Sequence, residues 1–176
     1  MLKYGEIDDI FPFLNDTEIE IFDAEFEKHA WTLNAGEVYY RQRGIPIRSF
    51  WYKELKNTLI EDLFVEKIET ILNAKIKTTR IYGNGQSHGQ TAWVHVDDND
   101  NDNICGSVVY YPHKNWMPHL GGHLIFVEND EVVASVFPKS NYAVMFNSAM
   151  PHCALEPTVY CLDMRISVAF KFKVVK

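Results

Sequence analysis

Two side chains that commonly bind metal ions stand two residues apart in "TAWVHVDDNDNDN", residues 91–103. If this segment forms a β-strand, alternate side chains share a face, so His95 and Asp97 lie side by side and Asp98 points away. A histidine and a carboxylate on one face supply two of the three ligands of a non-haem Fe(II) site. A strand-end histidine beside a solvated acid is the simpler alternative, and the pair alone leaves both open.

The acidic run that follows does not match a calcium-binding loop. An EF-hand loop requires glycine at its sixth position and glutamate at its twelfth. Counted from Asp98, those positions are Asn103 and Val109, and counting from the preceding aspartate fails as well. We interpret residues 98–103 as a solvated turn, with a calcium-dependent or interaction-type β-sandwich kept as an alternative.

A third metal ligand has to come from a distant part of the chain, and His152 in "MPHCALEP" is the candidate. It follows the apolar segment "YAVMFNS" and lies 55 residues after Asp97. This separation suits a jelly roll, in which a later strand returns beside an earlier one. Four other histidines are rivals: we attribute His88, His113 and His119 to exposed polar loops, whereas His123, on a predicted strand, could line a pocket.

The C-terminal segment "CLDMRISVAFKFKV" alternates apolar and polar residues, which indicates a strand with one buried face. Its even-numbered positions form a continuous apolar face. Its odd-numbered positions include Arg165 and Ser167, which either face solvent or line the interior of a barrel. In the second case the planar guanidinium of Arg165 could bind a carboxylate, with the hydroxyl of Ser167 as a further donor.

Two segments before residue 75 are predicted to be helical. Asp16 and Thr17 can cap a short helix, with Glu20 as the capping-box partner of Thr17. A second, amphipathic helix is predicted from about Ser49 to Ala74. Its apolar residues recur at mostly helical spacing: Leu55, Leu59, Leu63, Ile68, Ile71 and Leu72.

After residue 75 the apolar pattern has a period of two, which is typical of strands. The predicted strands are "IKTTRIYG", "TAWVHVD", "GSVVYYP", "GHLIFVE", "VVASVFP", "YAVMFNS" and "LDMRISVAFKFKV", separated by turns at 83–85, 98–103, 121–122, 129–130 and 138–141. Many short strands with turn residues between them favour a sandwich or barrel. We therefore predict a mainly β fold with N-terminal helices: a jelly-roll (double-stranded β-helix, cupin-like) core over about 76–174, packed against helices from about 1–75, in one domain of residues 1–176.

Composition limits the classes of function. The chain of 176 residues is 47% hydrophobic and 14% aromatic, which is enough for a packed core. A net charge of -7 disfavours binding to nucleic acid, which needs lysine and arginine against phosphates. Three cysteines without a CxxC pair, the lack of a signal-peptide pattern and the lack of an apolar run near ~18 residues lead us to expect a cytoplasmic protein without membrane partners.

Taken together, these segments resemble the prolyl 4-hydroxylase-like branch of the Fe(II)/2-oxoglutarate-dependent dioxygenases. The resemblance covers about residues 78–172 and lies in the order and spacing of "RIYGNGQ", "HVD", "VVYYPHKNW", "GGHLIF", "FPKSNYAVMFNS", "PHCALEP" and "RISVAF". It implies a jelly-roll oxidoreductase that uses Fe(II), 2-oxoglutarate and O2, with ascorbate as an optional further cofactor.

The resemblance also implies which residues form the active site. The metal ligands of the family correspond to His95, Asp97 and His152. The residues that would bind or flank 2-oxoglutarate are Arg165, Tyr111, Tyr82 and, as an added donor, Ser167. Either tyrosine could instead belong to the core, and Trp93 and Trp116 could line the pocket or simply pack.

The sequence departs from the family pattern at two points. Many relatives carry an acid or an aliphatic residue where "GGHLIF" has His123, a change that would alter the substrate pocket or have no effect. The interval from His152 to Arg165 is also a few residues longer than usual. We expect a longer turn before the last strand to absorb it.

The implied reaction is hydroxylation of an unactivated C–H bond, with succinate and CO2 as co-products. Three protein ligands suit it because coordination positions on the metal stay open. The first choice of substrate is a prolyl residue in a peptide or protein, and a free amino acid or other small metabolite is the alternative. A non-catalytic cupin-like binding module is a lesser alternative, and the oligomeric state is left open.

Overall fold

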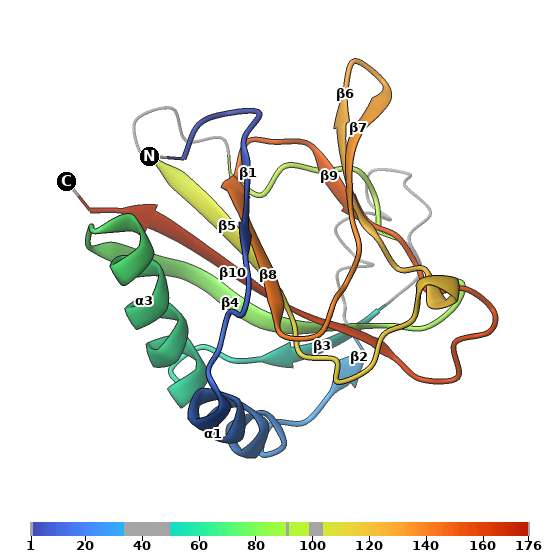
Figure 1. Ribbon diagram of the computed structural model, residues 1–176, viewed down its shortest axis with the longest axis horizontal. Helices are drawn as coiled ribbons and strands as arrows, with labels where there is room; N and C mark the ends of the chain where they lie inside the picture. Colours follow the sequence, from blue (N-terminus) through green and yellow to red (C-terminus); the bar gives the residue numbers. More distant parts are fainter. Residues whose placement is uncertain (1, 34–49, 91, 99–103, 176) are drawn as a thin grey trace.

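The computed structural model describes residues 2–33, 50–90, 92–98 and 104–175, whose strands form two sheets (Figure 1). The larger sheet has the order β1-β8-β5-β10-β4-β3-β2 and the smaller has the order β7-β6-β9. The strands are β1 Ile7–Ile10, β2 Thr32–Leu33, β3 Trp51–Glu54, β4 Ile76–Gln86, β5 Cys105–Tyr111, β6 Leu124–Glu128, β7 Glu131–Val136, β8 Tyr142–Asn147, β9 His152–Ala154 and β10 Arg165–Val174. The helices are α1 Asp16–Phe26, α3 Leu59–Leu72 and the short 3-10 helix η1 Pro118–Leu120. Within these ranges, no helix is both long and apolar enough to span a membrane.

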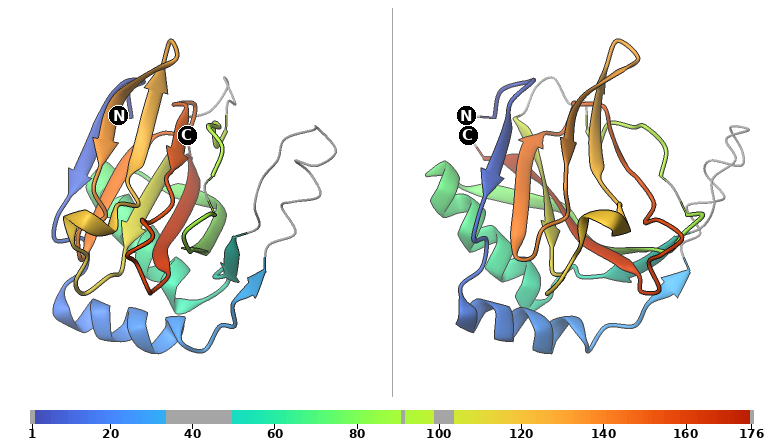
Figure 2. Two further views of the ribbon diagram at one scale, coloured as in Figure 1. Left: turned by 90° about the vertical axis from the view of Figure 1, so that its right-hand side faces the viewer. Right: turned by 45° about the vertical axis from the view of Figure 1, so that its right-hand side comes forward.

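Alternate side chains of the larger sheet pack into two separate hydrophobic cores, one on each side of the sheet. Val108 and Tyr110 of β5 pack with Phe170 of β10 on the side covered by α1 and α3. Val109 and Tyr111 of β5 pack on the other side, toward β6 of the smaller sheet. Figures 1 and 2 show both helices on one side of the larger sheet and the β6–β7 hairpin projecting from the molecule. The mainly β, jelly-roll fold predicted from the sequence is confirmed.

The first helix begins at a different cap from the one predicted. Asn15, not Asp16 or Thr17, is the N-cap: its side chain accepts a hydrogen bond from the backbone N–H of Glu18 at 3.0 Å. The carboxylate of Glu18 in turn accepts from the backbone N–H of Asn15 at 2.7 Å. Asparagine is as good a cap as serine or aspartate, and Glu18 lies three positions after it, so the capping box lies two residues earlier than predicted.

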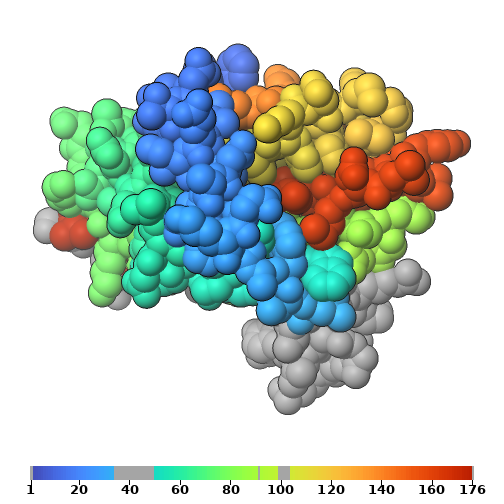
Figure 3. Space-filling view, turned by 90° about the horizontal axis from the view of Figure 1, so that it is seen from below, coloured from blue at the N-terminus to red at the C-terminus, as the bar shows by residue number. Residues whose placement is uncertain are grey.

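The second helix is shorter than predicted. Residues 51–54 form β3, and α3 begins only at Leu59, after Asn57 with its positive φ of 60° and Thr58 as N-cap. Ser49, the predicted start, lies outside the described residues. The face that packs is Ile60, Phe64 and Ile68, whereas Leu59 is 53% exposed. Figure 3, seen from below, shows α1 next to α3 on this face of the molecule.

The segment around the histidine–aspartate pair is not the strand that the sequence predicts. Over residues 92–97 its one β-bridge is antiparallel, between His95 and His152, and Trp93, Val94 and Val96 are exposed. Of the predicted turn at 98–103, only Asp98 belongs to the described residues. Gly83 and Gly85, predicted as a turn, lie inside β4, where a Cβ at Gly83 would sit only 3.2 Å from the ring of Phe26.

Candidate metal centre and cosubstrate pocket

Three side chains with metal-binding atoms converge between the two sheets. One ligand atom each of His95, Asp97 and His152 lies within 4.8 Å of the others. Nε2 of His95 is 3.4 Å from one carboxylate oxygen of Asp97, and Nε2 of His152 is 3.7 Å from the other. The structure thus brings the two neighbours in sequence together with the distant histidine proposed as their partner.

Backbone pairing sets this arrangement. The N–H of His95 donates to the carbonyl of His152 at 3.0 Å, and the N–H of His152 donates back at 2.9 Å. The Nδ1 atoms are 2.8 Å from the carbonyls of Trp93 and Met150 respectively. Because a carbonyl can only accept, each Nδ1 carries the proton, which leaves each Nε2 lone pair directed at the site.

The carboxylate of Asp97 is buried and held from several sides. Ser107 Oγ donates to Oδ2 at 2.7 Å and is itself 2.9 Å from Ser148 Oγ, while Lys171 Nζ donates to Oδ1 at 2.5 Å. Burial alone would raise the pKa of Asp97, but the charge of Lys171 and its hydrogen bond to the carboxylate hold the pKa well below the usual range. Asp97 is therefore an anion, as a metal ligand must be.

The environment of His152 favours its neutral form. Burial lowers the pKa of this imidazole, although the nearby Asp97 carboxylate opposes the shift. A neutral imidazole is the form that binds a metal ion. Two imidazoles and one carboxylate, with no fourth protein ligand among the described residues of the cluster, form the donor set of a non-haem Fe(II) site.

A pocket of about 380 Å³ opens beside this cluster. Strands β4 and β10 supply most of one wall, and the bridge segment around His95 supplies part of the rim. The lining residues are Phe50, Arg80, Tyr82, Asn84, Gln86, Ala92, Trp93, His95, Val96, Asp97, Val109, Leu124, His152, Ala154, Arg165, Ser167, Ala169 and Lys171. The odd-numbered side chains of β10 from Arg165 to Lys171 therefore face the pocket, and the alternative that they face solvent is wrong for Arg165 and Ser167.

Arg165 is fully buried at one end of the pocket, with only part of its donor capacity used. Its Nε donates to the carbonyl of Gly122 at 2.5 Å, and its Nη1 donates to Gln86 at 2.9 Å and to Ser167 at 3.3 Å. Gly122 has φ +75°, and a Cβ there would lie 2.8 Å from Arg165 Cδ. The backbone therefore cradles the arginine at a position where any side chain would displace it.

Two buried donors at this end of the pocket, one of them on Arg165 itself, lack an acceptor in the described part of the chain. Among the described residues, neither Arg165 Nη2 nor the hydroxyl of Tyr111 has a hydrogen-bond partner. The guanidinium carbon lies 5.5 Å from the centroid of the Tyr111 ring, and burial raises the pKa of Tyr111 to about 12, so its hydroxyl keeps its proton. Unpaired buried donors are rare and unfavourable, and a cation with a neighbouring O–H fits a carboxylate.

Tyr82, the second tyrosine predicted for the site, lies on the pocket wall. Its ring stacks on that of Tyr52 with centroids 5.3 Å apart. Arg80 lies 4.2 Å and Lys171 5.7 Å from the centroid of its ring, so two cations lie near one aromatic ring. Asn84 next to it has a buried amide oxygen without a partner among the described atoms.

The rival histidines lie apart from the metal-binding cluster. His88 and His119 are exposed, as predicted, and His123 packs near the ring of Phe137 at a centroid distance of 5.4 Å. The prediction that His113 is an exposed loop residue is wrong. Its Nε2 accepts a hydrogen bond from the backbone N–H of Ile166 at 2.9 Å, and its ring packs on Trp116 at 4.2 Å.

Several residues of the site are not predicted from the sequence. Ser107 gives one weak signal, a hydroxyl inside the otherwise apolar strand "CGSVVYY". Lys171 gives another, because it shares the pocket-facing parity of Arg165 on the last strand. Gln86 gives none, since its contact with Arg165 spans 79 residues of sequence.

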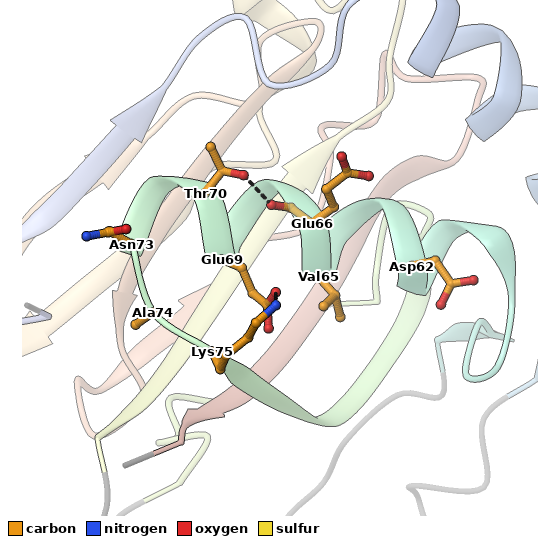
Figure 4. A pocket seen from close by; sticks show the side chains of 8 residues that line it. All are labelled: Asp62, Val65, Glu66, Glu69, Thr70, Asn73, Ala74 and Lys75. Carbon is orange, nitrogen blue, oxygen red and sulfur yellow. Dashed lines mark hydrogen bonds and ion pairs between the residues drawn. The ribbon is translucent and has the colours of Figure 1, made fainter.

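A second surface hollow lies away from this site, along α3 and the turn after it (Figure 4). Its lining residues are Asp62, Val65, Glu66, Glu69, Thr70, Asn73, Ala74 and Lys75. Glu69 is already paired with Lys75 at 2.6 Å, and Thr70 donates to the carbonyl of Glu66. None of its lining residues belongs to the pocket beside the metal-binding cluster.

Comparison with known proteins places this site in a family. Residues 78–173 match the family model of the 2OG-Fe(II) oxygenase superfamily. Comparison with curated proteins gives no match.

Among solved structures, similar folds occur in a prolyl hydroxylase from Trichoplax adhaerens in complex with a hypoxia inducible factor oxygen degradation domain peptide fragment. That match has a TM-score of 0.65 and 15% identity, covering 96% of this chain and 82% of that chain. A viral collagen prolyl hydroxylase from Paramecium Bursaria Chlorella virus-1, in a 2OG complex, has a TM-score of 0.61 and 17% identity, covering 98% of each chain. HygX from Streptomyces hygroscopicus, with nickel, 2-oxoglutarate and hygromycin B bound, has a TM-score of 0.63 and 13% identity, covering 95% and 82%.

These identities are low, so the solved structures establish the fold, a double-stranded β-helix that prolyl hydroxylases also have. The family match is a separate result and spans more than half of the chain, from β4 to near the end of β10. It includes the metal-binding cluster and Arg165. The chain belongs to the 2OG-Fe(II) oxygenase superfamily and is a 2-oxoglutarate- and Fe(II)-dependent dioxygenase.

Proposed function

We propose that the protein hydroxylates a C–H bond of a prolyl residue in a peptide or protein, consuming 2-oxoglutarate and O2 and releasing succinate and CO2. The observation that carries the proposal is the pair of unsatisfied buried donors, Arg165 Nη2 and the Tyr111 hydroxyl, at the end of a pocket that also holds the two-histidine, one-aspartate cluster. Such a pocket has a metal-binding site at one end and donors for a carboxylate at the other.

In this proposal His95, Asp97 and His152 bind Fe(II), which when bound supplies the oxidising chemistry with O2. Three protein ligands leave positions open for the cosubstrate and for O2. Ser107 and the two backbone carbonyls that accept from the imidazoles orient the ligands.

Arg165 and Tyr111 bind the distal carboxylate of 2-oxoglutarate in the same proposal. Ser167 Oγ accepts from Arg165, which leaves its own O–H free to donate to that carboxylate. Tyr82 forms the wall beside the cosubstrate. A distal anchor of this kind fixes the orientation of a small flexible molecule in a buried pocket.

Support for a prolyl substrate comes from the fold shared with the Trichoplax prolyl hydroxylase, a structure that contains a peptide fragment. A small-molecule substrate is the alternative, and it is favoured by the shared fold of HygX, which holds hygromycin B. Coupled succinate formation, measured with proline-containing peptides against peptides lacking proline and against free amino acids, separates the two.

The test of the site itself is an anaerobic titration of the protein with Fe(II) and 2-oxoglutarate, followed by the visible charge-transfer band of the chelate. The wild type should develop the band. His152→Ala should lose it, because a ligand is removed, whereas His119→Ala, which alters an exposed histidine, should keep it. Absence of the band in wild type, with iron shown to be bound by metal analysis, would contradict the proposal.

A further inference from the structure

The pocket is positively charged although the protein is acidic. The chain has 24 aspartates and glutamates against 17 lysines and arginines. Among the described residues that line the pocket, Asp97 is the sole acid, whereas Arg80, Arg165 and Lys171 are cations. A concave site with walls of one charge concentrates ligands of the opposite charge, so the local excess has to be explained.

Iron and the cosubstrate do not use up this excess. In the proposed function, the charges of Fe(II) and Arg165 are matched by those of Asp97 and the two carboxylates of 2-oxoglutarate. Lys171 and Arg80 are then left over. Both lie on the same side of the pocket, near the ring of Tyr82.

Lys171 is the deeper of these two cations. It lies six residues after Arg165 on β10, with the same parity, and its side chain is 14% exposed. Its Nζ contacts Asp97, so it stands within reach of anything bound next to the metal ligands. Burial of a lysine is unfavourable unless an anion accompanies it. Asp97 is the only acid among the described residues that line the pocket, and a bound metal ion would compete with Lys171 for its carboxylate.

Arg80 stands at the mouth of the pocket. It is exposed, and its guanidinium lies 4.2 Å from the Tyr82 ring centroid and 5.7 Å from that of Tyr52. The carboxylate of Glu54 accepts from the Tyr52 hydroxyl at 2.6 Å and also interacts with the charge of Arg80. Glu54 therefore offsets part of that charge. The pocket lining also includes three large apolar side chains, Phe50, Trp93 and Val96.

We infer that the substrate bears a carboxylate close to the carbon that is oxidised, that Lys171 binds this carboxylate in the loaded enzyme, and that Arg80 attracts it at the mouth. Phe50, Trp93 and Val96 then contact the uncharged part of the same molecule. This inference rests on the proposed function and adds to it the charge of the substrate.

The test uses the Fe(II)- and 2-oxoglutarate-loaded protein and pairs of proline compounds that differ only in charge. One pair is N-acetylproline and its primary amide, and a second is a proline peptide with glutamate or glutamine next to the proline. Binding is read anaerobically from the change of the chelate band, and turnover from succinate. The wild type should favour the acid of at least one pair by about ten- to hundredfold, the range of a charge-assisted hydrogen bond. A preference for the acid in the first pair would indicate a small carboxylic acid as the substrate. A preference in the second pair would indicate an acidic peptide.

Lys171→Met, which keeps the length of the side chain, should abolish the preference for the acid. Arg80→Gln should weaken it several-fold through KM, with little effect on kcat. Lys77→Gln is the matched control, because Lys77 is exposed on the same strand as Arg80 but outside the pocket. The apparent affinity for 2-oxoglutarate, measured in parallel, should change little in Arg80→Gln.

Three outcomes would overturn the inference. The wild type could show no preference for the acid in either pair. Lys171→Met could weaken the acid and the amide equally, which would make Lys171 a positioning residue for Asp97 alone. Lys77→Gln could reduce the preference as much as Arg80→Gln, which would indicate a general charge effect. Because the chelate band forms before substrate is added, its presence in each of these cases shows that the inference fails while the proposed function stands; its absence would remove both.

Discussion

The two ends of the pocket differ in how far their polar groups are already paired. At the metal-binding end, both oxygens of Asp97 accept hydrogen bonds, one from Ser107 and one from Lys171. At the other end, Arg165 Nη2 and the Tyr111 hydroxyl are buried without partners among the described residues. The first end is organised by the protein itself, whereas the second is complete only when an acceptor arrives. A variant at the second end can therefore separate binding from stability.

Tyr111→Phe is expected to weaken 2-oxoglutarate binding without weakening the fold. The hydroxyl has no hydrogen-bond partner among the described residues, so its removal should leave the free energy of unfolding unchanged or slightly higher. If it donates to a carboxylate of the cosubstrate, the loss should amount to about 1.5–3 kcal/mol, or about a ten- to hundredfold rise in KM for 2-oxoglutarate. Urea unfolding and succinate assays measure the two quantities.

Tyr142→Phe is the matched control for this prediction. Its ring stacks near that of Tyr111, with centroids 6.4 Å apart, but its hydroxyl donates to Asp9. This variant should therefore lose stability and keep the affinity for 2-oxoglutarate. The assignment of Tyr111 would be wrong if Tyr111→Phe destabilised the protein and left KM for 2-oxoglutarate at the wild-type value.

Some of the site could be predicted from residue types, although not always for the right reason. His95 and Asp97 were selected by strand alternation, yet residues 92–97 make only one bridge. Their convergence depends on the backbone pairing of His95 with His152, a contact over 57 residues that spacing alone cannot specify. Ser107 and Gln86 share this limit, since their partners are distant in sequence and a lone serine or glutamine carries no periodicity.

At the scale of secondary structure, one face of β10 contributes to the core and the other face lines the pocket. Its even-numbered residues Val168, Phe170 and Phe172 pack in the core beneath the helices, and its odd-numbered residues from Arg165 to Lys171 face the pocket. This division could be predicted because the strand has a clean period of two. The start of α3 could not, because Leu55 extends the helical spacing while the aromatic segment 51–54 pairs with β4 instead. Pairing with a neighbouring strand outweighed local periodicity there.

Phe64→Ala on α3 is expected to destabilise the fold and leave metal binding intact. Phe64 is fully buried and contacts Phe13, Tyr110 and Phe170, with ring centroids 5.0–5.7 Å away. Its truncation should lower the free energy of unfolding by about 3–5 kcal/mol. Because this core lies on the helix-covered side of the larger sheet, the Fe(II) affinity of the folded fraction should match the wild type (Figure 1).

Leu59→Ala provides the comparison on the same helix. Leu59 is 53% exposed at the first position of α3, so its truncation should change the free energy of unfolding by well under 1 kcal/mol. Denaturant unfolding at a temperature where Phe64→Ala is still folded gives both values. A drop in metal affinity of the folded Phe64→Ala protein would show that the helix-side core and the site are coupled through the sheet.

For the molecule as a whole, the loop after β5 is tied to the larger sheet at the start of β10. His113 makes this link, since its Nε2 accepts from the backbone N–H of Ile166 while its ring packs on that of Trp116. Burial, together with the charge of Arg165, lowers the pKa of His113 to about 4. In the unfolded chain the imidazole has its ordinary pKa of about 6.5 and binds a proton below that pH. In the folded protein it stays neutral down to about pH 4.

Stability should therefore fall as the pH drops from about 6.5 to about 4, because in that window the unfolded state binds a proton that the native state does not. For His113 alone the loss should reach about 2–3 kcal/mol at the acidic end. His113→Gln can still accept from Ile166 but cannot titrate, so its free energy of unfolding should depend less steeply on pH. Urea unfolding of metal-free protein across this window measures the difference between the two slopes.

His152, whose pKa is also lowered by burial, contributes acid sensitivity of its own and is present in both proteins, so it cancels in that comparison. His119→Gln supplies the second reference: an exposed histidine should give a curve parallel to the wild type. Parallel curves for His113→Gln as well would mean that the imidazole is protonated in the folded protein, and hence that it does not accept from Ile166. We expect the His113→Gln and wild-type curves to converge toward neutral pH, with the wild type falling faster in acid. That result would link the contact of His113 with β10 to the stability of the whole molecule.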